Sequence, residues 1–232
     1  MDDGTVQTIV TSPPYWNLKD YAHPGQIGFG APYEIYHRRL NRVWLHCKRV
    51  LHETGTMWVI ISNVKSNGEW VQLPYDIVRN CQRVGLCLQD IAVWNKPTAI
   101  AGLATGSLVN KFEHVLFFSK SKRRFKLRTR KVAGSSPDYR LHRLTNFWRL
   151  PVKAGSIGKS PQHEAYFPEE LVGRIIEIST DVNDLVLDPF LGSGTTMAVA
   201  LTLKREFVGY EINRKFLQLM RSRLNLVPSL PS

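Results

Sequence analysis

The spacing of apolar and polar residues along the chain predicts strands that alternate with helices. A short β-branched run at 8–10 stops at a double proline, which is typical of a strand that ends in a loop. Between residues 33 and 52 the apolar positions recur at the spacing of a helix with one buried face. The run at 56–62 is almost continuously apolar, as in a strand that is covered on both faces of a sheet.

The same alternation continues to the end of the chain. The later predicted elements are a helix at 73–84, strands at 88–94 and 114–119, a helix at 168–180, a strand at 185–187, a helix at 195–203, a strand at 207–210 and a helix at 214–224. This order favours a doubly wound α/β sheet with helices on both faces. The stretch 120–153 has only weak periodicity, and we predict that it is rich in loops.

Composition indicates a protein of the ordinary globular class. At 232 residues, with 43% hydrophobic and 22% charged residues, the chain is long enough for one domain with a substantial core. It contains no apolar run of membrane-spanning length and no start that resembles a signal peptide. Its three cysteines, Cys47, Cys81 and Cys87, have no metal-ligand spacing, which favours an intracellular protein with reduced thiols and without a metal site.

Positive charge is concentrated in one segment. The formal net charge is +12, and twelve of the 31 Lys and Arg residues lie within 120–153, together with a single acid, Asp138. A solvated basic loop, a linker or a nuclear-localisation signal would share this composition. Aromatic residues and Asn146 lie among the charges, however, and this mixture favours contact with nucleic acid.

A glycine loop near the C-terminus has the setting of a cofactor site. The stretch DPFLGSGTT at 188–196 follows a predicted strand and opens a predicted helix, where glycines and free N–H groups can approach a ligand. Glu211 ends the next predicted strand, where a carboxylate can accept hydrogen bonds from ribose hydroxyls. The missing third glycine argues against a dinucleotide, and the missing Gly-Lys-Ser/Thr argues against a phosphate loop. Adenosine with a charged methionine tail fits the pattern better.

A second motif, TSPPYW at 11–16, follows the first predicted strand. It could be a proline-stiffened turn that plugs the core with an aromatic ring. It could also hold an exocyclic base amine, a poor nucleophile, between a Ser12 acceptor and the carbonyl that Pro13 fixes. An aromatic ring beside it could stack on a base that has swung out of the duplex.

Together the two motifs resemble those of the beta-group DNA amino-methyltransferases, which modify N4 of cytosine or N6 of adenine. In that group the catalytic tetrapeptide precedes the cofactor loop and the target-recognition region lies between them, as the basic segment does here. The stretches at 94–97, 113–120 and 163–168 are similar to further family segments. The resemblance implies a Rossmann-like doubly wound methyltransferase sheet with a small basic target-recognition insertion. The catalytic part would span 1–119, the recognition segment 120–153 and the cofactor-binding part 154–232.

The resemblance also implies which residues act. Catalysis would involve Ser12, Pro13, Pro14 and Tyr15. S-adenosyl-L-methionine, which yields S-adenosyl-L-homocysteine, would be held by Asp188, Pro189, Phe190, Gly192, Ser193, Gly194, Thr195, Glu211 and Phe167. No metal is implied.

DNA is the implied partner, and a homodimer is a frequent assembly in this group. We expect phosphate contacts from Lys122, Arg123, Arg124, Lys126, Arg128 and Arg130, and base contacts from Arg140, Arg143 and Asn146. A membrane is not an expected partner. The expected compartment is the cytoplasm, with nucleoid association, in a bacterium and the nucleus in a eukaryote.

Serine at position 12 favours cytosine N4, because Ser-Pro-Pro-Tyr is commoner in N4 enzymes and Asp-Pro-Pro-Tyr in N6 enzymes. Adenine N6 stays open, as do an RNA or protein-glutamine methyltransferase and an inactive DNA-binding module. Carbon-5 methylation is disfavoured because it needs a cysteine nucleophile, usually after a proline, whereas Cys81 follows Asn80 in a predicted helix.

Overall fold

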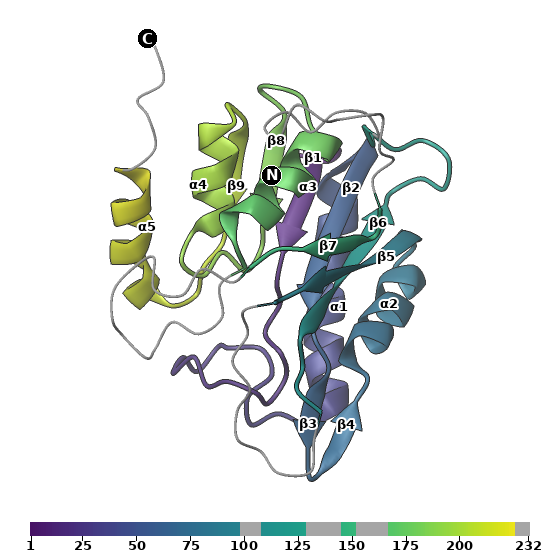
Figure 1. Cartoon of the computed structure of the whole chain (residues 1–232), viewed down its shortest axis with the longest axis vertical. Coiled ribbons are helices and arrows are strands. Elements are labelled where there is room, and N and C mark those ends of the chain that lie inside the picture. The colour runs from purple at the N-terminus through teal and green to yellow at the C-terminus, as the bar shows by residue number, and fades with distance from the viewer. Residues whose placement is uncertain (98–107, 129–144, 152–166, 226–232) are drawn as a thin grey trace.

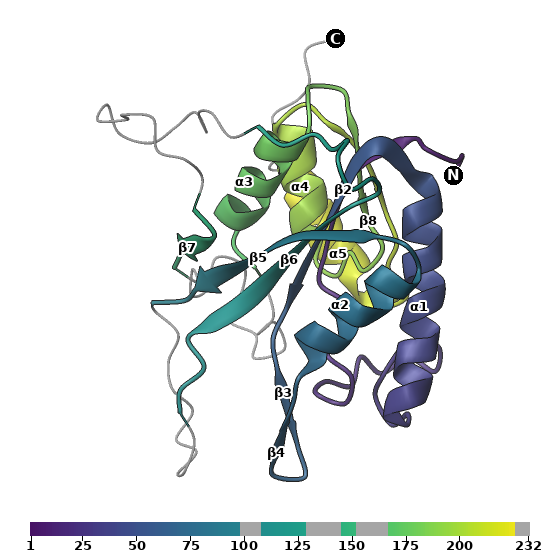
Figure 2. The same ribbon diagram turned by 90° about the vertical axis from the view of Figure 1, so that its right-hand side faces the viewer.

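The protein folds around one seven-stranded sheet with helices on both faces (Figures 1 and 2). The computed structural model describes residues 1–97, 108–128, 145–151 and 167–225. The strands of the sheet are β1 (Val6–Thr11), β2 (Leu51–Ile61), β5 (Cys87–Asn95), β6 (Phe112–Ser119), β7 (Phe147–Arg149), β8 (Leu185–Asp188) and β9 (Glu206–Gly209). The predicted α/β class is therefore confirmed.

Strand direction gives the sheet two distinct edges. The order is β7-β5-β6-β2-β1-β8-β9, and β6 alone runs antiparallel to its two neighbours. The other strands all end at one edge, which is the lower one in Figure 1 and which we call the carboxyl edge. We call the opposite edge, where these strands begin, the amino edge. The reversal of β6 was not predicted from the hydrophobic pattern.

The helices form one layer on each face of the sheet (Figure 2). Helices α1 (Tyr33–Val50) and α2 (Leu73–Arg83) cover one face, and α3 (Glu169–Ser179) and α4 (Thr195–Thr202) cover the other. A 3-10 turn (Arg214–Phe216) leads into α5 (Leu217–Leu224), which packs beside α4 through Met220. Within the described part of the chain, no helix has the length and apolarity that crossing a membrane would require.

Strand β2 shows why a continuous apolar run was the correct signal. Successive side chains of a strand point to opposite faces. Met57 and Val59 pack with α1 and α2, whereas Trp58 and Ile60 pack with α3 and α4. All four side chains are at most 3% exposed. Both faces of the strand are therefore core, as predicted.

Two features were missed. Strands β3 (Val64–Ser66) and β4 (Glu69–Val71) form a hairpin that extends from the carboxyl edge (Figure 2). Its turn residues Asn67 and Gly68 have φ of 50° and 85°, as a tight hairpin turn requires. Strand β7 lies inside the segment that we predicted to be rich in loops, and its Trp148 is 4% exposed.

The start of the basic segment, residues 120–128, is also anchored to the fold. The backbone N–H of Lys126 donates to the Thr54 carbonyl at 2.9 Å, and that of Arg128 donates to the Ile178 carbonyl at 2.7 Å. Phe125 and Leu127 pack against the core. This part of the segment therefore crosses the amino edge as a fixed strap.

Candidate active site

A cavity of about 600 Å³ opens at the carboxyl edge and contains both sequence motifs. It lies where the strand order switches, because β1 has β2 on one side and β8 on the other. Open α/β sheets bind ligands in the crevice at such a switch point. A second, more open depression of about 740 Å³ lies at the amino edge and contains neither motif.

The loop after β1 brings Ser12, Pro13, Pro14 and Tyr15 to the cavity wall. The Tyr36 hydroxyl on α1 donates to the Pro14 carbonyl at 2.7 Å, which fixes the turn from the helix side. Trp16 follows with a φ of 46° and is not among the lining residues. Its indole Nε1 donates to the Ala31 carbonyl at 2.9 Å, so the ring closes the loop at 16–31.

Tyr15 begins a chain of polar contacts along the wall of the cavity. Its hydroxyl donates to Glu113 Oε2 at 2.8 Å and accepts from Ser12 Oγ at 3.4 Å. Lys96 Nζ donates to Glu113 Oε1 at 2.9 Å. Burial, with a smaller contribution from the charge of Glu113, raises the pKa of Tyr15 well above its usual value. Tyr15 therefore acts as a neutral phenol.

Glu113 and Lys96 were not predicted as site residues, although both line the cavity. Lys96 directly follows β5, and Glu113 stands at the start of β6. Because β6 runs antiparallel to β5, its beginning lies at the edge where β5 ends. Charged residues at these two strand ends were a usable signal, but reading it required the direction of β6.

The glycine loop turns from β8 into α4. Gly192 and Gly194 have φ of 55° and 85°, a region that side chains other than glycine rarely adopt. A Cβ at Gly209 on the neighbouring strand would lie 2.7 Å from Leu191 Cδ2 and 2.8 Å from the Phe207 ring, so a larger residue there would require these side chains to shift. Gly192 lines the cavity, whereas Gly194 begins α4 and does not line it.

Asp188 connects the two motif loops. Its Oδ1 accepts from Thr11 Oγ1 at 2.7 Å and from the Phe190 N–H at 3.0 Å, and its Oδ2 accepts from Thr196 Oγ1 at 2.7 Å. Burial raises the pKa of this carboxyl to about 6, although the three hydrogen bonds act in the opposite direction. Asp188 is 1% exposed and does not line the cavity. Asp188 thus fixes the glycine loop from behind the cavity wall.

Glu211 faces the cavity from the end of β9. Its Oε2 accepts from the Gly192 N–H at 2.8 Å and its Oε1 accepts from the Asn213 N–H at 2.7 Å. Each carboxylate oxygen keeps a second lone pair, so both can still accept from ribose hydroxyls. The apolar rings of Phe167, Pro189 and Phe190 line the same cavity. These acceptor atoms and apolar walls fit the adenosine part of S-adenosylmethionine.

The structure thus gathers most of the predicted site residues in one cavity. The lining residues include Ser12, Pro13, Pro14, Tyr15, Phe167, Pro189, Phe190, Gly192, Ser193, Thr195 and Glu211. Asp188 and Gly194 lie behind this wall. The loops also contribute residues that were not predicted, among them Tyr21 and Ile27.

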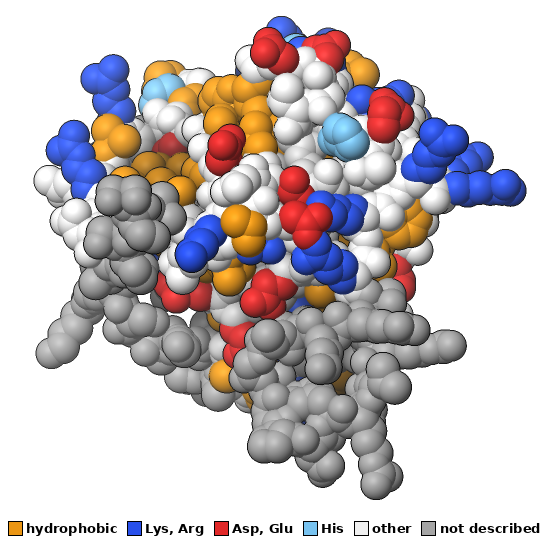
Figure 3. All heavy atoms as spheres, turned by 90° about the horizontal axis from the view of Figure 1, so that it is seen from above, with side chains coloured by type: hydrophobic (Ala, Val, Ile, Leu, Met, Phe, Trp, Pro, Cys, Tyr) orange, Lys and Arg blue, Asp and Glu red, His pale blue; other side chains and the backbone are white. Residues whose placement is uncertain are grey.

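The predicted phosphate-binding residues of the strap lie at the other edge. Strand β2 pairs with β6 from Thr56↔Ser119 to Ile61↔His114, which at ~3.3 Å per residue separates the edges by about 17 Å. Lys122, Arg123 and Arg124 are exposed at the amino edge. Seen from above, acidic and basic side chains are interspersed on this end of the molecule (Figure 3). Phosphate contact by these three residues stays a prediction.

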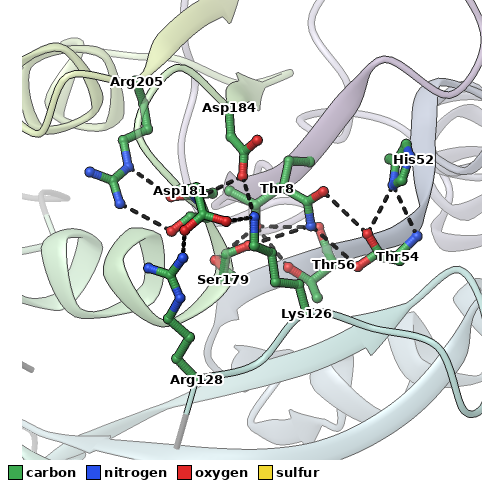
Figure 4. Close-up of polar contacts among 12 residues, drawn as sticks. Thr8, His52, Thr54, Thr56, Lys126, Arg128, Ser179, Asp181, Asp184 and Arg205 are labelled. Atoms are coloured by element: carbon green, nitrogen blue, oxygen red, sulfur yellow. Dashed lines mark hydrogen bonds and ion pairs between the residues drawn. The ribbon is translucent and has the colours of Figure 1, made fainter. Parts of the chain in front are cut away.

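Lys126 and Arg128 have partners within the protein itself (Figure 4). Lys126 Nζ pairs with Asp184 at 2.7 Å and also with Asp181, and Arg128 pairs with Asp181. These carboxylates occupy the two side chains that we had expected to meet DNA phosphates. The sequence places Asp181 and Asp184 far from the basic segment, whereas the fold brings them together, and phosphate contact by Lys126 and Arg128 stays a prediction.

The remaining predicted DNA contacts are placed only in part. Arg130, Arg140 and Arg143 lie outside the described residues. Asn146 is exposed and precedes β7, and its carbonyl accepts from the Val93 N–H at 2.7 Å. Since β5 also carries Trp94, which lines the cavity, Asn146 lies on the strand pair next to the site.

Comparison with known proteins supports a single family. A family model for DNA methylases matches residues 6–222. The type II methyltransferase M.Cfr9I of Citrobacter freundii is 29% identical over 97% of this chain and 83% of the relative. M.MjaI of Methanocaldococcus jannaschii is 30% identical over 97% of this chain and 87% of the relative.

Two solved structures have the same fold. A putative DNA modification methylase of Thermus thermophilus, complexed with S-adenosyl-L-methionine, is 25% identical with a TM-score of 0.69, over 99% of this chain and 90% of that chain. The cytosine-N4-specific PvuII DNA methyltransferase is 20% identical with a TM-score of 0.79, over 100% of this chain and 83% of that chain. Because the family match spans both motif loops and the strands between them, the chain belongs to the DNA methylase family, the S-adenosylmethionine-dependent amino-methyltransferases of N4 and N6.

Proposed function

We propose that this enzyme methylates N4 of cytosine in DNA. The observation that carries the proposal is the position of Ser12, whose tetrapeptide lines the same cavity as the glycine loop and Glu211. Serine at this position is the family's commoner choice for cytosine, and the cytosine-N4-specific PvuII enzyme has the same fold. Type II methyltransferases among the relatives support DNA as the substrate and a role in restriction–modification.

The chain's residues divide the work between two sides of the cavity. When bound, S-adenosylmethionine supplies an electrophilic methyl group on a positively charged sulfur, and the product is S-adenosylhomocysteine. Glu211, Gly192 and the apolar rings would hold it on the β8–β9 side. On the β1 side, Ser12 Oγ and the Pro13 carbonyl would accept the two hydrogens of the target amino group. This arrangement leaves the nitrogen lone pair directed at the methyl group.

DNA would approach the carboxyl edge, with the target base flipped out of the duplex. A base within a duplex cannot reach the bottom of a cavity formed by strand ends and the loop at 16–31. The Tyr15 ring lines the cavity beside Ser12 and would stack on the flipped base. No covalent intermediate on the protein is needed, because the amine attacks the methyl group directly: the N–C bond forms as the S–C bond breaks, and the methylated nitrogen then releases one proton to water. Homodimer formation stays a prediction.

Mass spectrometry of nucleosides tests the proposal. The protein is incubated with S-adenosylmethionine and unmethylated DNA, and the DNA is then digested to nucleosides. We expect N4-methyldeoxycytidine from the wild type and a yield reduced by about 10²–10³ from Ser12→Ala, since one preorganised polar contact at a reacting group contributes this much. Cofactor affinity of Ser12→Ala should equal that of the wild type.

Other products would change the proposal in defined ways. N6-methyldeoxyadenosine would keep the family and the mechanism but overturn cytosine as the target. The absence of both products, with intact cofactor binding, would overturn this DNA as the substrate.

A further inference from the structure

The hydrogen-bond chain that runs from Ser12 through Tyr15 to Glu113 has a definite donor-to-acceptor direction. Ser12 Oγ donates to Tyr15 Oη at 3.4 Å, and Tyr15 Oη donates to Glu113 Oε2 at 2.8 Å. The first contact is longer than an ordinary O–H···O hydrogen bond, and active-site hydrogen bonds often shorten only when the substrate is bound. Both hydroxyl hydrogens are therefore directed at acceptors within the protein, and the lone pairs of Ser12 stay free to accept hydrogens from a ligand.

Glu113 sets this direction because an ionised carboxylate accepts hydrogen bonds and cannot donate them. The phenol of Tyr15 must donate to it, so the phenol oxygen is left to accept from Ser12. The other acceptor near the phenol is the Ile60 carbonyl at 3.4 Å, which is a weaker competitor at that distance.

Lys96 fixes the carboxylate. Its ammonium group donates to the second oxygen, Oε1, at 2.9 Å, and the two side chains are only 17% and 16% exposed. The same ammonium lies 5.5 Å from the centre of the Trp94 ring. Glu113 is therefore held between a cation on one oxygen and the phenol on the other, with little freedom to turn.

We propose that Glu113 is a positioning residue for methyl transfer. It acts through Tyr15 and keeps Ser12 Oγ in the acceptor state that a target amino group needs. This inference rests on the proposed function, because only a substrate that donates hydrogens requires an acceptor at Ser12. A target amino group carries two N–H donors, so a Ser12 hydrogen that pointed into the cavity would oppose it.

Glu113→Gln allows the hydrogen bond between residue 113 and the Tyr15 phenol to reverse its direction, with almost no change in the shape of the side chain. The amide nitrogen of glutamine can donate to the phenol oxygen, which frees the phenol hydrogen to turn toward Ser12. We expect kcat to fall by about 10- to 100-fold, the size of effect that misplacement of a reacting group produces. The KM for DNA and the Kd for S-adenosylmethionine should stay within about twofold, since the contacts proposed for the two ligands do not include Glu113.

A double variant separates this role from a merely structural one. In Tyr15→Phe the phenol oxygen is gone, so Glu113 has nothing through which to act. We expect Tyr15→Phe/Glu113→Gln to have the kcat of Tyr15→Phe alone, which is the non-additivity of residues that work in series. If the two losses in kcat multiply, or if Glu113→Gln changes KM and leaves kcat unchanged, the inference is overturned.

A matched control and a second readout complete the experiment. Glu53→Gln makes the same chemical change at an exposed glutamate that pairs with Lys120 at the amino edge, and it should leave kcat unchanged. Fluorescence of 2-aminopurine next to the target base reports base flipping, which should be equal in Glu113→Gln and wild type. Loss of flipping in Glu113→Gln would contradict a role confined to Ser12. A wild type that transfers no methyl group to DNA would instead overturn the proposed function and this inference with it.

Discussion

The two edges of the sheet use similar residues for different purposes. At the carboxyl edge the Lys96–Glu113 pair borders a cavity, and the loops around it contain residues with positive φ at Trp16, Gly192 and Gly194. At the amino edge the Lys126–Asp184 pair joins the strap at 120–128 to the turn before β8. One pair lies beside a place for a ligand, and the other holds two segments of the chain together.

Buried hydroxyl groups add to the rigidity of the amino edge (Figure 4). Thr8 and Thr56 share a hydrogen bond of 2.9 Å across β1 and β2, and Ser179 donates to Thr8 at 3.2 Å from α3. All three residues are fully buried. Satisfied polar groups of this kind specify how segments dock. The comparison shows that the concentration of positive charge in a sequence does not say which edge of a fold it will occupy.

The largest expected effect is at the carboxyl edge. A tryptophan in place of Gly192 would fill the cofactor side of the cavity, where a Cβ meets no protein atom within 4 Å. Calorimetry should show S-adenosylmethionine binding weakened by about 100-fold or more, equivalent to ~3 kcal/mol. Gly68→Trp is the matched control, since that glycine also has positive φ and open space but lies at the hairpin tip. Equal cofactor affinity in the wild type and Gly192→Trp would overturn the site.

A second effect concerns pH and the connection between the motif loops. Because burial raises the pKa of Asp188 from 3.8 to about 6, the folded protein holds a proton in this window that the unfolded chain has lost. The free energy of unfolding therefore falls as pH rises through the window, by roughly 2–3 kcal/mol from this group. Asp188→Asn should lack this fall in urea titrations at pH values on either side of the window.

Asp20 gives a control of opposite sign for that measurement. Hydrogen bonds from Gln26 and the Ala22 N–H lower the pKa of this exposed carboxyl. Its contribution to stability is present above the unfolded pKa and is lost as pH falls through the folded pKa. An Asp188→Asn variant with the same pH dependence as the wild type would contradict the burial argument.

A smaller effect is expected at the amino edge. Lys126→Met removes the ammonium between Asp181 and Asp184, and we expect the free energy of unfolding to fall by about 1–2 kcal/mol. The kcat at saturating DNA should be unchanged, because the cavity is at the other edge. Lys122→Met, in the same strap but exposed, should leave stability unchanged within about 0.5 kcal/mol. Thermal unfolding of the two variants measures this difference, and equal stability of Lys126→Met and Lys122→Met would contradict the structural role of Lys126.

The smallest effect is expected from the exposed part of the strap. Replacement of Lys122, Arg123 and Arg124 by serine should weaken DNA binding by at most about tenfold, with kcat unchanged, because these residues lie at the amino edge and DNA approaches the carboxyl edge. A triple variant of exposed arginines elsewhere, Arg38, Arg42 and Arg221, carries the same change in net charge. Equal losses of affinity in both triple variants would show that the strap makes no specific phosphate contacts.

Local patterns predicted most of the fold. The helical spacing of apolar residues in α1, which buries Leu40 and Trp44, predicted a helix, and the continuous apolar run in β2 predicted a strand that is covered on both faces. The glycine loop was recognisable because its glycines and its place between strand and helix are local features. Strand β7 was missed because it is only three residues long, and its Trp148 is buried through contacts with residues distant in sequence, such as Trp58 at a distance of 6.1 Å between ring centroids.

The site was predictable where its residues are consecutive and unpredictable where the fold assembles them. Ser12 to Tyr15 are adjacent in sequence, but Glu113 is 98 residues from Tyr15 and reaches it only because β6 is reversed. Asp181 likewise meets Arg128 through tertiary structure. Which carboxylate pairs with which distant side chain depends on the topology of the sheet, and the spacing of hydrophobic residues does not reveal that topology.

Hydrogen–deuterium exchange with S-adenosylhomocysteine, and then with a DNA duplex added, tests the division between the two edges most directly. We expect S-adenosylhomocysteine to protect 188–195 and 210–213, and DNA to protect in addition the loop at 12–31 and the hairpin at 64–71. The backbone at 51–56 and 178–185 should exchange at the same rate throughout. Protection confined to the amino edge, with the motif loops unchanged, would contradict the placement of chemistry at the carboxyl edge.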